Sequence, residues 1–386
     1  MPQFYEFFAG GGMAQAGLGH HWACRFANDF DEMKAATYCA NWGGEHMVCG
    51  DVNDIKPGDV PELADLAWAS FPCQDLSLAG NYAGIGAADS GSQTRSGAFW
   101  AFWKLMLGLK ADGRAPNMIV LENVSGVLTA NKGRDFAAIG DCIARAGYRF
   151  GAVLIDAIHF VPHSRPRVFI VAIRADLTIP DDILTASPIL PWHPGPLVAA
   201  FGGMTDSAKD AWLWLNLPTP DIQRRRKLES IIDDNPEGLR WHTSSETDRL
   251  ISMMSERNLG KLERMKSRGQ RTIGTIYKRT RQGQQRAELR DDGISGCLRT
   301  PAGGSSRQLI LVVDGERVRS RLLAPREAAR LMGLPDQYKL PSNYNHAYHV
   351  AGDGVAVPVV RHLAAFILEP VLQMQAITRQ YAVAAE

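Results

Sequence analysis

The sequence predicts an α/β protein whose mostly parallel sheet is covered by helices on both faces, with a smaller, irregular second domain. The first 175 residues alternate short apolar runs with helical patterns, which is typical of a parallel sheet. At 386 residues the chain is long for one domain. Near residue 180 the rhythm ends in the proline-rich stretch TASPILPWHPGPL. We therefore predict a sheet domain over residues 1–180, completed by 321–386, and a second domain over 181–320.

Seven apolar runs in the first part are strand candidates. They are 3–8, 22–29, 46–52, 65–71, 117–124, 152–158 and 167–173. Between the fifth and sixth runs, Phe136, Ile139 and Ile143 recur at helical spacing, and Gly147 suits the end of a helix. Helical patterns resume after residue 320, in 324–334 and 358–376.

Composition favours a cytoplasmic globular protein, associated with the nucleoid if the source is bacterial. Of the residues, 45% are hydrophobic and 22% charged, and we find no apolar run long enough to suggest a membrane span. The start MPQFYEFFAGGG lacks the basic segment and cleavage site of a signal peptide. The six cysteines form no Cys-x-x-Cys pair or zinc spacing, so we expect reduced thiols and no metal.

The charge distribution indicates a polyanionic partner. The net charge is only +1, but residues 261–290 hold ten Lys or Arg and two Glu. Such a block suits contact with nucleic acid, and we take Lys278, Arg279 and Arg281 as candidates. A solvated, charged helix face is the alternative.

The first apolar run is followed by a glycine loop that could hold a ligand. Gly10, Gly11 and Gly12 precede a predicted helix, where glycine lets the backbone approach a ligand at the carboxyl edge of a sheet. The second run ends at Asn28-Asp29, and Asp51-Val52 close the third. Together these positions favour an adenosine-containing cofactor, with an acid on the ribose and Val52 near the adenine; surface caps would explain either acid alone.

Three further strand ends carry reactive side chains. Cys73 follows the apolar run 65–71, and a thiolate there could act as a nucleophile at the edge of the sheet. The glycine-rich stretch after it suits a loop that closes on a substrate, with a flexible connection as the alternative. Glu122 ends the next run and is suited to proton transfer. Arg165 and Arg167 alternate into the last run, so we expect both on one side of the sheet, binding an anion or acceptor oxygens.

An ordered set of motifs resembles those of the cytosine-5 DNA methyltransferases. FAGGG, FPCQ, ENV, HSRPR, RLLAPREAARLMGLPDQY and AGDGVAVPVV occur in the family's order, within the first 175 and last 65 residues. FPCQ followed by ENV about fifty residues later is highly specific. Met13, His163 and Asp353 stand where this family commonly has glycine, glutamine and asparagine.

The resemblance implies a methyltransferase-type, Rossmann-like catalytic domain and a target-recognition domain. It further implies that the enzyme methylates carbon 5 of a flipped-out cytosine in double-stranded DNA. S-adenosyl-L-methionine would be the methyl donor and S-adenosyl-L-homocysteine the product. Cys73 would attack carbon 6, Glu122 would act on ring nitrogen 3, and Arg165 would stabilise the carbonyl oxygen. Arg167 would support Glu122 or a phosphate. A companion restriction endonuclease is an open alternative, and no membrane or metal partner is expected.

The remaining candidates are assigned through the same motifs. The predicted cofactor-binding residues are Phe8, Ala9, Gly10, Gly12, Met13, Asn28, Asp29, Asp51, Val52, Phe71, Pro72, Asp353 and Val355. The predicted DNA-binding residues are Gln74, Ser77, Lys278, Arg279 and Arg281.

Three other functions compete with this interpretation. An RNA cytosine-5 methyltransferase would share the core, but the insert of about 140 residues favours DNA. A non-catalytic DNA-binding relative would not need Cys73, Glu122 and Arg165 together. A thiol hydrolase using Cys73 and a histidine would explain neither the glycine loop nor the paired arginines.

Overall fold

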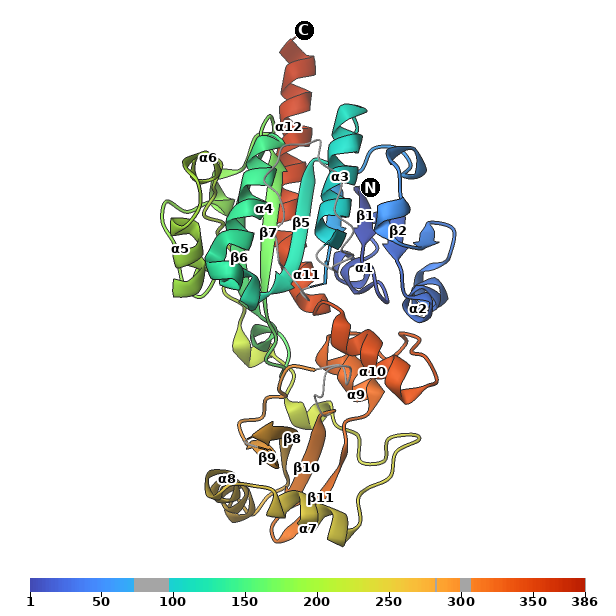
Figure 1. Cartoon of the computed structure of the whole chain (residues 1–386), viewed down its shortest axis with the longest axis vertical. Helices are drawn as coiled ribbons and strands as arrows, with labels where there is room; N and C mark the ends of the chain where they lie inside the picture. The colour runs from blue at the N-terminus through green and yellow to red at the C-terminus, as the bar shows by residue number, and fades with distance from the viewer. Residues whose placement is uncertain (73–96, 282, 299–306, 386) are drawn as a thin grey trace. The chain divides into compact units, whose positions relative to one another are not determined.

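The computed structural model describes residues 1–72, 97–281, 283–298 and 307–385. The chain forms two compact units, coloured along the sequence in Figure 1. The first unit comprises Met1–Ile155, Pro166–Thr219 and Val359–Glu386. The second comprises Asp156–Arg165 and Pro220–Pro358.

The first unit is built on a seven-stranded sheet of order β3-β2-β1-β4-β5-β7-β6. Its strands are β1 (Gln3–Phe7), β2 (Ala23–Asp29), β3 (Met47–Cys49), β4 (Leu66–Ala69), β5 (Met118–Val124), β6 (Tyr148–Asp156) and β7 (Pro166–Arg174). The pairs from β3 to β5 are parallel, whereas β5 and β7 are antiparallel. The strand order reverses between β1 and β4, and ligands of open α/β sheets bind at the carboxyl ends of the strands beside such a point.

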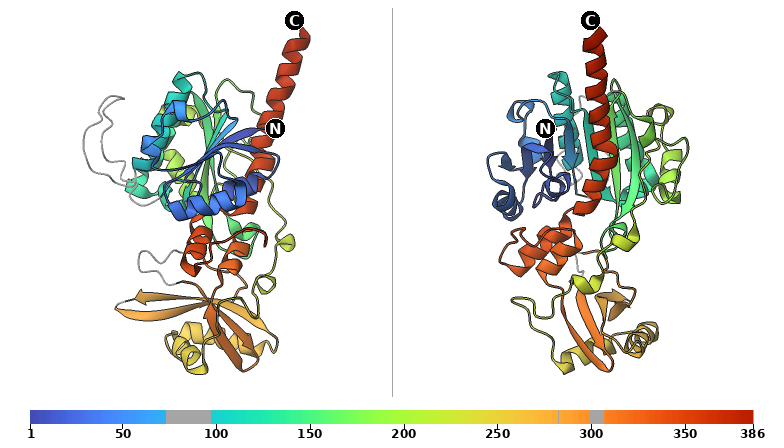
Figure 2. Two further views of the ribbon diagram at one scale, coloured as in Figure 1. Left: turned by 90° about the vertical axis from the view of Figure 1, so that its right-hand side faces the viewer. Right: turned by 180° about the vertical axis from the view of Figure 1, so that it is seen from behind.

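Helices cover both faces of this sheet, as predicted (Figure 2). They are α1 (Met13–Leu18), α2 (Glu32–Trp42), α3 (Gly97–Ala111), α4 (Arg134–Arg145), α5 (Gly195–Gly202), α6 (Asp206–Asp210), α11 (Val357–Leu363) and α12 (Glu369–Ala385). One face is buried by α3 and α4, whose Phe102 and Phe136 belong to the main core. On the other face, Arg361 donates to the carbonyl oxygen of Leu18 over 2.8 Å.

All seven predicted apolar runs contain a strand. The third is shorter than expected, since β3 ends at Cys49 and Val52 begins a 3-10 helix. The sixth begins earlier than expected, at Tyr148. The amphipathic pattern that we assigned to a helix forms α4.

The second unit contains a regular sheet where the sequence indicated an irregular domain. Its antiparallel strands have the order β11-β10-β8-β9. They are β8 (Thr272–Arg281), β9 (Gln284–Arg290), β10 (Leu309–Asp314) and β11 (Arg317–Leu322). The α-helices of this unit in the described residues are α7 (Ser244–Ser252), α8 (Glu256–Ser267), α9 (Pro325–Leu331) and α10 (Tyr344–Asp353). One face of this sheet packs against α7 and α8 in a small core, to which β9 contributes Ala287 and Leu289. These two residues alternate with polar ones, which concealed β9 in the sequence. By contrast, β10 is a continuous apolar run up to its last residue, LILVVD, that was not predicted.

The limits of the two units differ from the predicted limits at 180 and 320. Residues 181–219 belong to the first unit because they extend its sheet edge: Phe150 donates to the carbonyl of Ala211 and accepts from the amide of Leu213, over 2.9 and 2.6 Å. The indole of Trp192 donates to the carbonyl of Leu217 over 2.7 Å. Residues 321–358, with α9 and α10, belong to the second unit.

One apolar stretch needs comment because of its length. Tyr344–Thr378 is long and apolar enough to cross a membrane, by length and composition only. More than half of its most apolar window is buried inside the structure, which is what a core helix of a globular domain also shows.

Candidate functional site

The glycine loop after β1 requires backbone conformations that side chains disfavour. Phe8, Gly10 and Gly12 have φ angles of 56°, 56° and 77°, in the left-handed region. A Cβ on Gly12 would lie 2.3 Å from the indole nitrogen of Trp42, so only glycine fits there. Gly12 is also the N-cap of α1, which begins at Met13. The loop is therefore a tight strand-to-helix turn at the carboxyl edge of the sheet.

The two residues that end β2 hold this loop. The carboxylate of Asp29 accepts from the amide of Gly10 over 2.7 Å and from that of Asp31 over 2.9 Å. Burial raises the pKa of Asp29 above its ordinary value, against the opposing effect of these hydrogen bonds. Asn28 donates to the carbonyls of Val48 and Gly50 over 3.0 and 2.9 Å. Contact of Asn28 or Asp29 with a cofactor remains a prediction.

An aromatic residue beside this acid was not among the sequence candidates. Phe30 directly follows β2, and its side chain is 72% exposed. The sequence showed an aromatic residue next to a ligand-type acid, but it did not show that the ring is exposed. The third strand end differs from it: Asp51 accepts from the amide of Asn53 over 2.9 Å, while Val52 is buried in the main core.

A buried acid lies beneath the loop and was also missed. Glu6 is in the middle of β1 and is 2% exposed. Its Oε1 accepts from the amide of Ala14 over 3.2 Å, at the start of α1. Burial raises the pKa of Glu6 to about 8, with Asp29 adding a smaller upward effect. The signal in the sequence was one charged residue inside the apolar run 3–8.

Glu6 is expected to make the stability of the protein depend on pH. In the unfolded chain its carboxyl has an ordinary pKa near 4.5, whereas in the folded chain the pKa is about 8. Between these values only the folded state retains the proton, so stability falls as pH rises through this window and then levels off. Thermal melting of the parent and of Glu6→Gln across this range checks the effect. The midpoint of the parent should fall more steeply with pH, and parallel profiles would contradict the assignment.

The residues that lead to Cys73 are fixed by the ENV motif. The ring of buried Phe71 packs on that of Phe99, with centroids 5.3 Å apart. Asn123 donates from its amide side chain to the carbonyl oxygen of Phe71 over 3.1 Å. Pro72 is exposed. The candidates Cys73, Gln74 and Ser77 lie outside the described residues.

Glu122 is paired with one of the two predicted arginines. Arg167 Nε lies 3.0 Å from Glu122 Oε1, and both side chains are largely buried. The pairing of β5 and β7 explains the contact, because Val124 lies opposite Arg167 in the ladder. Arg167 also donates to the carbonyl oxygen of Pro166 over 2.8 Å. The site thus has a carboxylate held by a guanidinium at the end of β5.

Arg165 is positioned differently from the prediction. It precedes β7 and belongs to the second unit, so strand alternation does not place it beside Arg167. Its amide donates to Asp156 over 2.6 Å, and its guanidinium donates to the carbonyl of Gly354 over 2.7 Å. The second contact joins Arg165 to the AGDGVAVPVV motif. In that motif Asp353 is exposed and Val355 is buried.

His163 performs an acceptor role where glutamine was expected. It is fully buried, and its Nε2 accepts from the amide of Leu298 over 3.2 Å. Two further bonds tie the same segments: Ser164 donates to the carbonyl of Ser295 over 2.9 Å, and Ser295 donates to that of Pro162 over 2.8 Å. Hydrogen bonds therefore join residues 162–165 to residues 295–298.

The basic block lies on α8 and the β8–β9 hairpin, and carboxylates neutralise much of it. Arg279 is paired with Glu288 over 3.1 Å, whereas Lys278 lies opposite Ala287 and points to the other sheet face. The side chain of Arg281 lies outside the described residues. Further ion pairs within this block are Arg264–Asp291, Lys266–Glu263, Lys266–Glu316, Arg271–Asp234 and Arg290–Asp292. The block is thus less positive than its composition indicates.

The sheet, the glycine loop and the Glu122–Arg167 pair fit the family that the sequence motifs resemble. The family model described as C-5 cytosine-specific DNA methylase matches residues 2–369. The chain belongs to this family, and it is an enzyme of the DNA cytosine-5 methyltransferase class. This confirms the resemblance and the fold class inferred from the motifs.

Individual relatives agree over nearly the whole chain. The Type II methyltransferase M.HaeII of Haemophilus aegyptius is 27% identical over 362 residues, covering 93% of this chain and 90% of its own. M.NlaX of Neisseria lactamica is 26% identical, covering 94% and 95%. Among solved structures, the S. pombe Dnmt2 methyltransferase aligns with a TM-score of 0.60 at 15% identity, covering 96% and 99%. A putative DNA modification methyltransferase from an E. coli prophage aligns at 0.55 and 16%, covering 97% and 100%. These two structures show likeness of fold.

Proposed function

We propose that this protein transfers a methyl group from S-adenosyl-L-methionine to carbon 5 of a cytosine flipped out of double-stranded DNA. The observation that carries the proposal is the junction of β4 and β5. These parallel neighbours pair Ala69 with Leu121, so the residues that follow each strand emerge at the same edge. Asn123 binds the backbone of Phe71, two residues before Cys73, while its neighbour Glu122 is held by Arg167. We propose that Cys73, which follows Phe71 by two residues, acts together with Glu122 at this edge of the sheet.

The residues fit the proposed cofactor. The left-handed loop from Phe8 to Gly12 leaves no space for a side chain at Gly12, and exposed Phe30 offers a ring beside Asp29. We propose that this loop and the ends of β2 and β3 hold the donor, with Asp353 and Val355 contributing from the closing motif. When bound, S-adenosyl-L-methionine supplies an electrophilic methyl group.

The chemistry requires the side chains proposed for it. Carbon 5 of cytosine is a weak nucleophile. Addition of the Cys73 thiolate to carbon 6 converts the ring into an enamine, in which carbon 5 is the nucleophilic carbon. Glu122 shares a proton with ring nitrogen 3, which draws electrons from carbon 6, and Arg167 holds that carboxyl in place. Arg165 stabilises charge on the carbonyl oxygen. After methyl transfer, a base takes the proton from carbon 5, the electrons of that C–H bond re-form the double bond between carbons 5 and 6, and the Cys73 thiolate leaves. A stacked base is out of reach, so the cytosine must be flipped.

Methyl transfer to DNA tests the proposal directly. The purified protein is incubated with plasmid DNA and S-adenosyl-L-methionine carrying a labelled methyl group, and the DNA is then digested to nucleosides. We expect label in 5-methyldeoxycytidine and, on sequencing after bisulfite treatment, at a defined short site. Label on an exocyclic nitrogen, or in RNA only, would contradict the proposal.

The names of the relatives bear on whether a second enzyme accompanies this protein. The curated relatives are Type II methyltransferases, so we propose a restriction endonuclease of matching specificity as the companion of this protein. DNA methylated by this chain would then resist that endonuclease.

A further inference from the structure

The second unit contains a basic segment that the sites above do not use. We call residues 221–234 the basic strap, because the four cations of 224–227 follow one another in it. Four acids flank this run, so the net charge of the whole segment is zero: Asp221, Glu229, Asp233 and Asp234. The strap is formed by two short 3-10 helices, Ile222–Arg224 and Leu228–Ser230. Leu228 and Ile231 are buried, whereas Arg226 and Lys227 are exposed. The strap is therefore anchored by its apolar residues and presents its charges to solvent.

One end of the strap is tied to the segment that carries Arg165. The guanidinium of Arg225 donates to the carbonyl oxygen of Ile158 over 2.9 Å. The carboxylate of Asp156 accepts from the amides of both Ile158 and Arg165, over 3.1 and 2.6 Å. A short network thus runs from Arg225 through Ile158 and Asp156 to Arg165. The charges that follow Arg225 are held at a fixed place relative to a candidate catalytic arginine.

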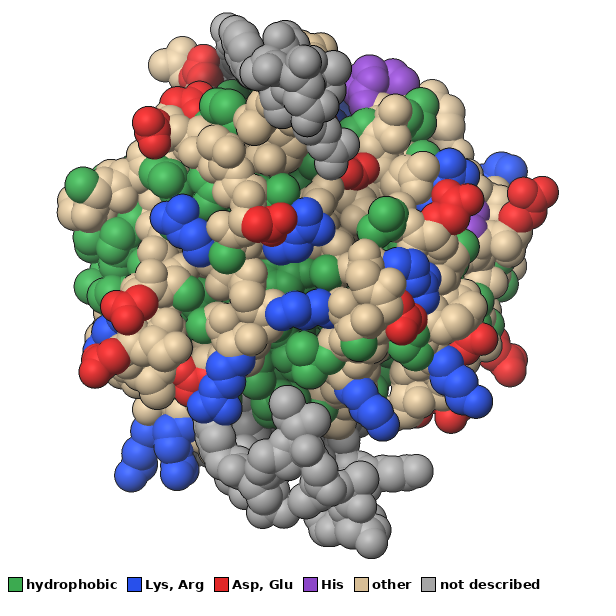
Figure 3. Space-filling model, turned by 90° about the horizontal axis from the view of Figure 1, so that it is seen from above, with side chains coloured by type: hydrophobic (Ala, Val, Ile, Leu, Met, Phe, Trp, Pro, Cys, Tyr) green, Lys and Arg blue, Asp and Glu red, His purple; other side chains and the backbone are tan. Residues whose placement is uncertain are grey.

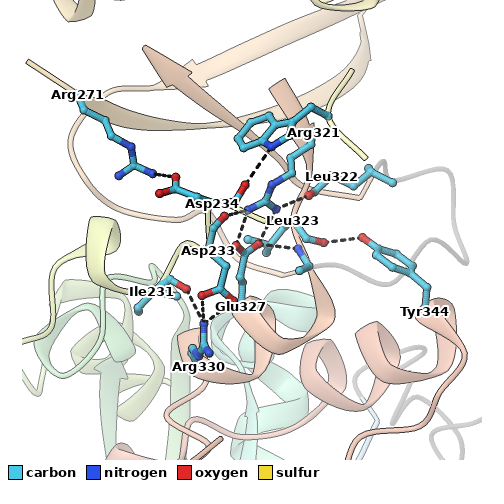
Figure 4. Close-up of polar contacts among 12 residues, drawn as sticks. Ile231, Asp233, Asp234, Arg271, Arg321, Leu322, Leu323, Glu327, Arg330 and Tyr344 are labelled. Atoms are coloured by element: carbon cyan, nitrogen blue, oxygen red, sulfur yellow. Dashed lines mark hydrogen bonds and ion pairs between the residues drawn. The ribbon is translucent and has the colours of Figure 1, made fainter. Parts of the chain in front are cut away.

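The other end of the strap is clamped by buried ions, as Figure 4 shows. The amide of Asp233 donates to Glu327 over 2.8 Å, and its carbonyl accepts from Arg321 over 2.6 Å. The carboxylate of Asp233 accepts from Arg330 over 2.9 and 2.8 Å. Arg321 and Glu327 are themselves a fully buried pair. With both ends fixed, the strap loses little conformational freedom when it binds a ligand.

The charges of the strap differ from those of the β8–β9 hairpin. In the part of the chain that the structure describes, Arg226 and Lys227 form no ion pair, and Arg226 donates to the carbonyl of Ser230 over 3.3 Å. Arg279 in the hairpin is neutralised by Glu288. On the face of the molecule in Figure 3, Lys and Arg side chains are interspersed with Asp and Glu. After Arg330, Arg226 also contributes to the lowered pKa of Asp336. Because Arg226 and Lys227 are exposed and neither is held in an ion pair in the described residues, both can contact neighbouring phosphates.

We propose that the basic strap is a phosphate-binding surface for the substrate DNA, separate from the β8–β9 hairpin. It holds the sugar-phosphate backbone through Arg226 and Lys227, while Arg225 fixes this surface relative to Arg165. The inference rests on the proposed function, which supplies DNA as the polyanion. Such contacts add affinity that does not depend on sequence and fix the register of the protein on the duplex.

The salt dependence of DNA binding tests the strap. The probe is a short, fluorescently labelled DNA duplex of mixed sequence, titrated with the full-length protein at several potassium chloride concentrations. Each lost phosphate contact lowers the slope of log affinity against log salt by about 0.9. The double variant Arg226→Ala/Lys227→Ala should therefore lower it by about 1.8 and weaken binding roughly tenfold or more near 0.1 M salt. Arg249→Ala/Arg257→Ala, which removes two exposed cations from α7 and α8, is the matched control and should retain the parent slope.

The outcomes separate the strap from the proposed function. A strap variant with the slope of the parent, or equal losses in strap and control variants, would overturn the inference. Weaker binding to an RNA duplex with unchanged binding to DNA would also overturn it. If the parent binds DNA but transfers no methyl group to cytosine, the proposed function fails while the strap result stands.

Discussion

Glu122→Gln is expected to slow methyl transfer by about a hundred- to ten-thousandfold, the usual contribution of a positioned general acid. Glutamine has nearly the shape of glutamate and can still accept from Arg167, whose Nε lies 3.0 Å from the native carboxylate. It cannot share a proton with ring nitrogen 3 of cytosine. The fall should therefore appear in kcat, with a smaller change in the KM for DNA.

Trapping of the covalent intermediate measures this step more directly. DNA that carries 5-fluorocytosine at the target should form a lasting adduct with the parent, since fluorine cannot leave as a proton. Cys73→Ala should form no adduct and transfer no methyl group, so it serves as the negative control for both measurements. Glu122→Gln should form the adduct slowly, and Glu45→Gln, an exposed acid elsewhere in the first unit, should behave as the parent. A parent-like rate for Glu122→Gln would remove this residue from the mechanism.

Glu327→Ala is expected to destabilise the second unit by about 3–5 kcal/mol, the usual cost of leaving one partner of a buried ion pair alone. Arg321 and Glu327 have no exposed side-chain surface, and Glu327 accepts from both terminal nitrogens of Arg321, over 2.8 and 2.6 Å. Glu327 also accepts from the amides of Ala324 and Asp233, over 2.7 and 2.8 Å. Alanine would leave both amides without this acceptor, and Arg321 would be a buried cation without its carboxylate, although it would still donate to the carbonyls of Leu322 and Asp233.

Thermal and urea unfolding of the parent and of Glu327→Ala would measure the loss in free energy of unfolding. The transition of the second unit is followed by the fluorescence of Trp241, as the difference between the signal of each protein and that of the same protein with Trp241→Phe. Trp241 is a suitable reporter because the guanidinium of Arg321 lies 5.0 Å from the centre of its ring. The paired replacement Arg321→Met/Glu327→Leu should cost less than Glu327→Ala, since no charge is left buried. A loss below about 1 kcal/mol in Glu327→Ala would mean that water or another acceptor takes over these hydrogen bonds.

The strands of the first unit could be predicted because buried parallel strands are continuous apolar runs. The same reasoning located the ends of β1, β2 and β5, and with them the glycine loop, Asp29 and Glu122. Phe30 and Glu6 were missed for opposite reasons. The importance of Phe30 depends on its exposure, and that of Glu6 on its burial, and neither can be derived from a short stretch of sequence.

The second unit was harder to predict because its elements depend on partners distant in the chain. β8 pairs with β10, which follows it by about thirty residues. The position of Arg165 depends on Asp156 and Gly354, and the charge on the basic block depends on carboxylates such as Asp234 and Glu316. Counting Lys and Arg could not show which cations are neutralised. It also passed over the shorter run 224–227, in which Arg226 and Lys227 form no ion pair within the described residues.

The connectivity of the second unit bears on how the target-recognition role that the family resemblance implies for it could change between relatives. Most of it is a single stretch, Pro220–Pro358, inserted between two parts of the first unit. Recombination between relatives could therefore exchange this stretch as a cassette, without rethreading the central sheet. The ion clamp of Asp233, Arg321, Glu327 and Arg330 would travel inside the cassette. The bond from Arg225 to Ile158 would not, because Asp156–Arg165 is encoded upstream. A viable chimera must bring its own donor for that carbonyl, and this requirement limits which cassettes are interchangeable.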